Sequence, residues 1–112
     1  MAIAIHKEKH DAAHAVRFSA QEEGKEIGRA FLYVLKNDLH DEPFGLLEDV
    51  FVVDAHRGRG IGTQLVHSVI EEAKARGCYK LIGQSRYGRD AAHAMYENIG
   101  FKNHGYNFRM DF

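Results

Sequence analysis

The chain has 112 residues, enough for one domain with its own hydrophobic core. Its composition is 45% hydrophobic and 28% charged, and a net charge of -1 gives no overall attraction to nucleic acid or anionic membranes, so an anion site must be local. No apolar run approaches the roughly 20 residues that span a bilayer, so we expect a soluble protein with one domain over residues 1–112. Cys78 is the single cysteine, which excludes an internal disulfide and leads us to expect a cytoplasmic protein.

The first half of the chain is typical of β-strands. Segments rich in β-forming residues cover 13–21 and 26–36, and the intervening EEGK predicts a hairpin with Gly24 at its tip. After a polar loop, GLLEDVFVVD is expected to be a third strand. Its apolar side chains are nearly continuous, which predicts a strand covered on both faces and interrupted only by Glu48 and Asp49, whose side chains would point to opposite faces.

The spacing of apolar residues changes to a helical period at Ile61. Apolar side chains recur every three or four residues as far as Ala73, and Gly77 is placed to end this helix. The segment CYKLIG, residues 78–83, then reads as a fourth strand.

A second helix is expected from Asp90, its N-cap, to Gly100, which stops it. One face of this helix carries Ala92, Met95, Tyr96 and Ile99. The segment GYNFRMDF, residues 105–112, is the last predicted strand. Strands followed by strand, helix, strand, helix and strand predict an α/β protein of the α+β type, with helices packed on a mixed, mainly antiparallel sheet.

Three glycines and two arginines occupy the turn between the third strand and the first helix. The first N–H groups of a helix lack intrahelical partners and the helix dipole is positive there, so an anion such as a phosphate is favoured. No lysine follows Gly60 or Gly62, which excludes a P-loop. Gly58, Gly60 and Gly62 are spaced Gly-x-Gly-x-Gly, whereas the dinucleotide-binding motif needs Gly-x-Gly-x-x-Gly.

The pattern that fits is Arg-x-x-Gly-x-Gly, formed by Arg57, Gly60 and Gly62, with EDVFVV before it and MYENIGF after it. This order resembles the GNAT superfamily of acetyl-CoA-dependent N-acetyltransferases over about residues 27–112. The segments LEDVFV, RGRGIG, GCYK and MYENIGF are most similar to glucosamine-6-phosphate N-acetyltransferases, although the N-terminal part is short and lacks an evident pair of substrate-covering helices. The resemblance implies a GNAT-like fold with a strand-loop-helix pyrophosphate site.

The resemblance also implies where the cosubstrate acetyl-CoA binds. Loop N–H groups would hold the pyrophosphate of CoA, and the backbone of the preceding strand would pair with the pantetheine arm. The implied CoA-binding residues are Phe51, Val52, Val53, Arg57, Gly58, Arg59, Gly60, Ile61, Gly62, Thr63 and Arg89. Arg89 stands where many family members carry a CoA-contacting asparagine. No metal is expected.

The reaction itself requires a base and benefits from an acid. An amine with a pKa near lysine's, about 10.4, is protonated at neutral pH and must lose a proton before it attacks a thioester. Either Glu48 or Asp49 could be the base, directly or through water, and we favour Glu48; the alternative is that both carboxylates cap or pair with arginines at the sheet's rim. The resemblance places Tyr96, five residues before Phe101, at the family's general-acid position, opposite the leaving thiolate.

The N-terminal histidines and Cys78 are weaker candidates for metal binding or catalysis. His6, His10 and His14 are spaced four apart, but on an extended segment they are too far apart to bind one metal ion. Cys78 is expected to be a small buried apolar group. The predicted activity is N-acetylation of a small-molecule amine in a ternary complex; the alternative is a CoA-binding module without turnover. Because a second copy could complete the uncovered site, a homodimer is expected.

Overall fold

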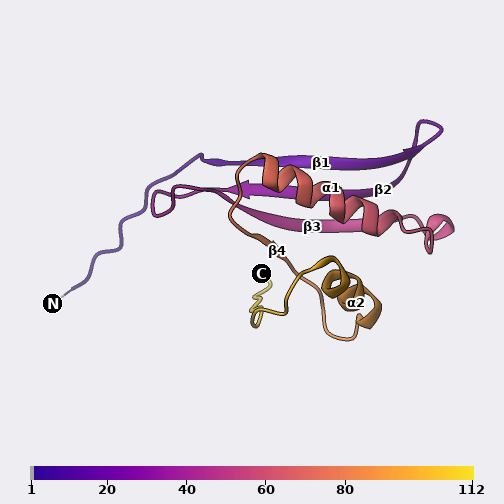
Figure 1. The fold of residues 1–112 in the computed structure, drawn as a ribbon. Helices are drawn as coiled ribbons and strands as arrows, with labels where there is room; N and C mark the ends of the chain where they lie inside the picture. The colour runs from indigo at the N-terminus through magenta and orange to yellow at the C-terminus, as the bar shows by residue number, and fades with distance from the viewer. Residues whose placement is uncertain (1) are drawn as a thin grey trace.

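The computed structural model describes residues 2–112, which form one four-stranded sheet with two α-helices. The elements in chain order are β1 (Ala13–Glu22), β2 (Lys25–Leu35), β3 (Phe44–Val52), the 3-10 helix η1 (Asp54–His56), α1 (Ile61–Ala75), β4 (Leu81–Gly83) and α2 (Asp90–Ile99). The strand order is β1-β2-β3-β4; only the β3–β4 pair is parallel (Figure 1). The predicted mixed, mainly antiparallel sheet is therefore confirmed.

The predicted hairpin joins β1 to β2. Glu23 and Gly24 form the two-residue turn, and both have positive φ angles, 53° and 76°. Paired left-handed residues match the twist of antiparallel strands, and glycine adopts this backbone without strain. The turn sets the pairs of Glu22 with Lys25 and Gln21 with Glu26; the register shifts by one residue at Ala20 and then continues to the pair of Ala13 with Leu35.

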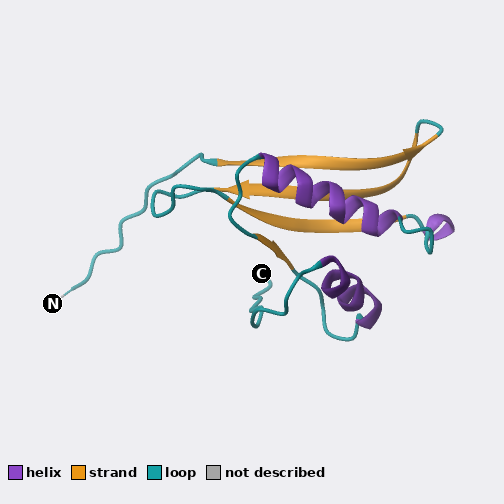
Figure 2. Ribbon diagram, viewed as in Figure 1, coloured by secondary structure: helices purple, strands orange, loops and turns teal. Residues whose placement is uncertain are grey.

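Helix α1 covers one face of the strands, as Figure 2 shows. Its buried residues recur every one, three or four positions and form one stripe: Ile61, Leu65, Val66, Val69 and Ala73. This stripe packs on Ala30 and Leu32 of β2 and on Leu47 of β3, all buried. Gly77, with a φ of 77°, follows the end of the helix as predicted.

The expectation that β3 is covered on both faces was wrong. Burial alternates along the strand, with Gly45 and Leu47 buried toward α1, whereas on the other face Leu46 is half-buried and Phe51 is exposed. On the face of the sheet that is turned away from α1, none of the described helices packs over β1 and β2 (Figure 1). Here we call it the open face of the sheet. Apolar continuity predicted two-sided cover because sequence alone does not show that a second layer is missing.

A β-bulge interrupts β3 at its two acidic residues. Phe31 pairs with Glu48 and Arg29 with Phe51, so Asp49 and Val50 together stand opposite Ala30. Asp49 takes the left-handed backbone that this bulge requires, with a φ of 53°. The extra residue shifts the alternation, and Val50 and Val52 therefore pack toward the core beyond the bulge.

Three boundary predictions in the second half differ from the structure. The fourth strand is shorter than CYKLIG, because Cys78 and Tyr79 donate their N–H groups to Ala73 and Pro43 and only Leu81–Gly83 pairs with β3. Asp90 is not the N-cap; Arg89 caps α2 with a non-helical backbone, and Asp90 lies in the first turn. Residues 105–112 form no strand, since no described residue pairs with their backbone.

Candidate functional site

The loop between β3 and α1 depends on left-handed glycines. Gly58 and Gly60 have φ angles of 80° and 78°, a region that side-chain-bearing residues rarely adopt. A Cβ built on either residue meets no atom within 4 Å, so these positions require glycine for their backbone conformation and not for lack of space. The loop surface is consequently bare backbone at two points.

The amino end of α1 offers hydrogen-bond donors to an anion. The first bond of the helix runs from the Gln64 N–H to the Gly60 carbonyl at 3.0 Å. The N–H groups of residues 61–63 thus have no intrahelical partner. No acidic side chain lies in the first turn of α1 to oppose the positive end of the helix dipole. The predicted phosphate site therefore has the donors and the field that it needs.

A cavity of about 190 Å³ lies at this helix end. It is lined by Val52, His56, Arg57, Gly58, Gly60, Ile61, Gly62, Thr63 and Met95. Seven of these nine residues are among the predicted CoA-binding residues. His56 and Met95 were missed: Met95 comes from α2, and its place on that helix's apolar face predicts burial but not which cavity it would line.

A larger hollow of about 570 Å³ lies elsewhere, between β1 and α1. Phe18, His67, Glu71 and Glu72 are among its lining residues. Its two glutamate carboxylates repel an anion. The hollow also lies along the middle of α1, where backbone N–H groups are already hydrogen-bonded, so it lacks the donors that the smaller cavity has. The smaller cavity is the better candidate for a phosphate-containing ligand.

The two arginines of the loop point in different directions. Arg57 donates from Nε to the Val52 carbonyl at 3.1 Å and pairs with Asp54 at 3.0 Å. Arg59 instead pairs with Glu22 of β1 at 2.8 Å, and this hydrogen bond lowers the pKa of the Glu22 carboxyl. Arg57 thus lies at the cavity, while Arg59 ties the loop to the β1–β2 hairpin.

Beyond the short β4, one edge of β3 is open. Strand β4 ends at Gly83, opposite Leu47, and β3 continues to Val52 with no described strand on that side. Val53 donates its N–H to Ile27 of β2 at 2.9 Å. Because successive backbone groups of a strand point to opposite edges, Val52 presents its N–H and carbonyl to the open edge. In this structure the Val52 carbonyl accepts a hydrogen bond from Arg57 Nε.

The predicted acid and base come together from different elements. Burial raises the pKa of the Tyr96 hydroxyl, the positive charge of Arg89 lowers it, and the negative charge of Glu48 raises it, with a net rise. These effects show that Glu48 of β3 and Arg89 at the start of α2 lie within electrostatic range of Tyr96. The Tyr96 ring packs edge-on against Phe101, with ring centroids 5.4 Å apart.

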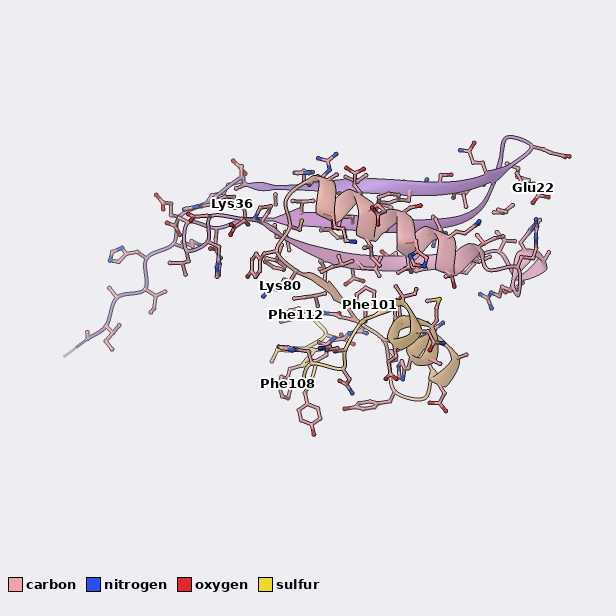
Figure 3. The ribbon with its side chains drawn as sticks, in the orientation of Figure 1. Glu22, Lys36, Lys80, Phe101, Phe108 and Phe112 are labelled. Atoms are coloured by element: carbon pink, nitrogen blue, oxygen red, sulfur yellow. The ribbon has the colours of Figure 1, made fainter. Side chains whose placement is uncertain are left out.

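The residue that follows the end of α2, Phe101, packs against β4 at Gly83, where an added side chain would meet only ordinary van der Waals contacts. A Cβ at Gly83 would lie 3.6 Å from a methyl carbon of Leu47 and 3.8 Å from the Phe101 ring. Phe101 is held in turn by the bond from its N–H to the Tyr96 carbonyl at 3.0 Å. Figure 3 labels Phe101 at this junction. The end of β4 therefore anchors the turn of α2 that carries Tyr96.

Glu48 and Asp49 occupy unlike positions. Glu48 is half-buried on the open face, directly opposite Phe31. Asp49 is exposed at the bulge, in the left-handed conformation. The bulge, which local sequence did not predict, thus replaces the simple alternation that would have pointed the two side chains to opposite faces.

The histidines of the N-terminal segment and Cys78 are the remaining candidates. Among residues 2–112, no group of three or more histidine, cysteine, aspartate or glutamate side chains could hold a metal ion. Burial raises the pKa of the Cys78 thiol, which disfavours a nucleophilic thiolate. Over the same residues no helix is both long and apolar enough to cross a membrane.

Comparison with known proteins places this geometry in a family. Residues 2–101 match the acetyltransferase (GNAT) family. Over 95 residues the chain is 33% identical to glucosamine 6-phosphate N-acetyltransferase of Trypanosoma brucei brucei, covering 84% of this chain and 63% of that protein. It is 32% identical over 72 residues to an aminoglycoside N(6')-acetyltransferase type 1 of Acinetobacter haemolyticus, covering 64% and 48% of the two chains.

Solved structures agree with the sequence comparison. The crystal structure of glucosamine-6-phosphate N-acetyltransferase from Arabidopsis thaliana superposes with a TM-score of 0.79 at 27% identity, over 88% of this chain and 67% of that one. The chain spans less than two thirds of the length of the Trypanosoma and Acinetobacter proteins described above.

The loop's backbone conformation predicts the effect of a substitution at Gly60. Gly60→Val should weaken CoA binding at least tenfold, because a β-branched residue is strained at a φ of 78° and moves the N–H groups that face the cavity. Calorimetric titration with CoA measures the affinity. The matched control is Gly77→Val at the other end of α1, with a φ of 77° and equally open surroundings. A folded Gly60→Val variant with unchanged CoA affinity removes the loop from the site.

Proposed function

The chain belongs to the acetyltransferase (GNAT) family, and from this premise we propose that it transfers the acetyl group of acetyl-CoA to a primary amine of a small molecule. The observation that carries the proposal is the cavity at the amino end of α1, where unpaired helix N–H groups meet an open edge of β3. A diphosphate group and an extended amide chain need these two features side by side.

The residues of the cavity fit the two parts of CoA. The N–H groups of Ile61, Gly62 and Thr63 would bind the pyrophosphate, and the absence of side chains at Gly58 and Gly60 leaves room for it. The N–H and carbonyl of Val52 would pair with the pantetheine arm. The arm competes with Arg57 for the Val52 carbonyl, so binding would release the Arg57 guanidinium toward the phosphates.

Acetyl transfer in this site would proceed by direct attack in a ternary complex. Glu48, directly or through a water molecule, accepts a proton from the ammonium form of the acceptor. The free amine attacks the thioester carbonyl carbon, a C–N bond forms, and the C–S bond breaks as the tetrahedral intermediate collapses. The second amine proton leaves with solvent, and CoA departs as a thiolate.

Tyr96 is the proposed donor to the leaving thiolate. Its pKa is raised above the ordinary value of about 10, so the hydroxyl stays protonated through the neutral range. The hydroxyl belongs to the turn of α2 that Gly83 and Phe101 hold against the end of β4. A proton donor is therefore kept near the point where the open edge of β3 begins.

Amino sugars are the first acceptors to test, because the relatives described above are named for glucosamine 6-phosphate and for aminoglycosides. Incubation of the protein with acetyl-CoA and an amine should release one equivalent of free CoA thiol for each N-acetyl product. A thiol-release screen over amino sugars, polyamines and amino acids detects this. CoA binding without thiol release from any of these amines would favour the alternative of a binding module without turnover.

Removal of the Tyr96 hydroxyl tests the acid. Tyr96→Phe should lower turnover by roughly 10²–10⁴, or about 3–5 kcal/mol of transition-state stabilisation, and leave CoA affinity and the melting temperature nearly unchanged. The aromatic ring, and with it the packing on Phe101, is retained. Tyr87→Phe is the control, since Tyr87 is 91% exposed. Turnover within about threefold of wild type would make Tyr96 a packing residue.

Amide substitutions separate the two carboxylates. Glu48→Gln should lower turnover by roughly 10²-fold or more, because the amide cannot accept the amine proton. Asp49→Asn should stay within about threefold, since asparagine tolerates the left-handed backbone at the bulge. Steady-state kinetics on an identified acceptor gives both values. The reverse order of effects would assign the base to Asp49.

A further inference from the structure

The open face of the sheet carries aromatic and charged side chains next to the candidate base. Phe31 and Tyr33 of β2 are half-buried there, and their rings lie nearly parallel, with centroids 6.2 Å apart. Phe31 stands directly opposite Glu48 of β3. On its other side it pairs with Arg17 of β1, whose guanidinium lies 5.7 Å from the ring centroid. Aromatic rings of this kind can pack against the apolar body of a small molecule.

Arg17 is already bound to a carboxylate on this face. Its two terminal nitrogens donate to the two oxygens of Glu26 at 2.7 and 2.9 Å. This paired hydrogen bond lowers the pKa of the Glu26 carboxyl to about 2, so Glu26 stays charged throughout the neutral range. The two charges cancel, and the forked donor of Arg17 is occupied.

Arg29 is a cation of the open face without such a partner. None of the ion pairs among residues 2–112 includes it. Its guanidinium lies over the Phe51 ring, 4.8 Å from the centroid. The charge of Arg29 also lowers the pKa of Glu26, so these two groups and Arg17 lie within electrostatic range of one another. Together the three carry one surplus positive charge.

Arg29 and Glu48 are diagonal neighbours across β2 and β3. Arg29 pairs with Phe51, and Phe31, two residues further along β2, pairs with Glu48. Diagonal neighbours on one face of a sheet stand roughly 7–8 Å apart. A molecule with its ammonium group at Glu48 would therefore lie over Phe31 and reach Arg29 with a group only a few bonds away. The two charges are complementary to a zwitterion in this orientation.

We propose that the open face binds the acceptor, and that Arg29 selects amines that carry an acidic group, a carboxylate or a phosphate, a few bonds from the reacting nitrogen. The inference rests on the acetyl transfer proposed above and names the acceptor class of that reaction. Both acidic groups accept two parallel hydrogen bonds from a guanidinium. A polycationic amine such as an aminoglycoside would place further positive charges beside Arg29 and is disfavoured.

Pairs of amines that differ in the acidic group test the acceptor class. β-Alanine is compared with its amide, and glucosamine 6-phosphate with glucosamine. In at least one pair the acidic member should have a kcat/KM roughly tenfold higher or more, because a charge-assisted hydrogen bond is lost in the neutral member. The pair with the larger ratio identifies the acid as a carboxylate or a phosphate. Turnover of the neutral members as fast as the acidic ones overturns the inference and leaves acetyl transfer standing.

Replacement of Arg29 tests the residue itself. Arg29→Gln should raise the KM of the acidic amine roughly tenfold or more, and leave kcat, the KM of the neutral amine and the Kd of acetyl-CoA within about threefold. Arg29→Lys, which keeps the charge and loses the fork, should recover part of the loss. Arg76→Gln is the matched control, since Arg76 pairs with Glu72 at the end of α1. An Arg29→Gln variant that loses CoA affinity instead contradicts the assignment.

Glu26→Gln should have an effect of opposite sign. It releases the Arg17 guanidinium and adds a second uncancelled positive charge to the open face, so the KM of the acidic amine should fall by about threefold or more. A rise of this KM in both Glu26→Gln and Arg29→Gln would indicate a disturbed sheet and contradict selection by charge.

Binding measured without turnover separates this inference from the proposed function. Calorimetric titration of the CoA-saturated protein should show tighter binding of the acidic amine than of its neutral counterpart, and Arg29→Gln should abolish the difference. This result in a protein that releases no CoA thiol would refute acetyl transfer and support the binding of acidic amines at Arg29. Equal affinity for both members of each pair overturns the inference, whether or not thiol is released.

Discussion

The packing of α1 on β2 and β3 determines where every part of the candidate site lies. Val66 and Val69 are fully buried against the sheet together with Leu32, and burying each such side chain contributes about 1.5–3 kcal/mol. With the helix held there, the chain must turn from the end of β3 to Ile61 through a few residues. Left-handed Gly58 and Gly60 make this turn, and the unpaired N–H groups of α1 consequently face the cavity.

The features predicted from sequence are those with a local physical cause. The β1–β2 hairpin follows from β-forming residues on both sides of Gly24, and α1 follows from apolar residues at helical spacing before Gly77. The chemistry of the loop is equally local, since the glycine spacing already predicts donors at a helix end. The individual residues were implied by the resemblance to the GNAT superfamily, which named seven of the nine residues that line the cavity.

The features that sequence did not predict depend on distant parts of the chain. Asp49 takes a left-handed backbone because β3 carries one residue more than β2 between two fixed pairs, a mismatch that appears only when the strands are aligned. Met95 reaches the cavity because α2 packs beside α1. The alternation of residues 105–112 predicts a strand, but a strand also needs a neighbour, and the described chain provides none.

The raised pKa of Tyr96 limits how this residue can help the leaving group. A CoA thiol has a pKa near the ordinary thiol value of about 8.5, whereas the phenol lies above its ordinary value of about 10. Complete transfer of the proton from Tyr96 to the thiolate is therefore uphill by more than about 1.5 pKa units, or about 2 kcal/mol. A hydrogen bond that strengthens as charge develops on sulfur needs no such transfer, and a phenol kept protonated by burial is well suited to donate it. Arg89 opposes the rise and Glu48 increases it. Once Glu48 has accepted a proton from the amine it is neutral and no longer raises the pKa of Tyr96, whereas Arg89 still lowers it, so the hydroxyl becomes a better hydrogen-bond donor as the thiolate forms.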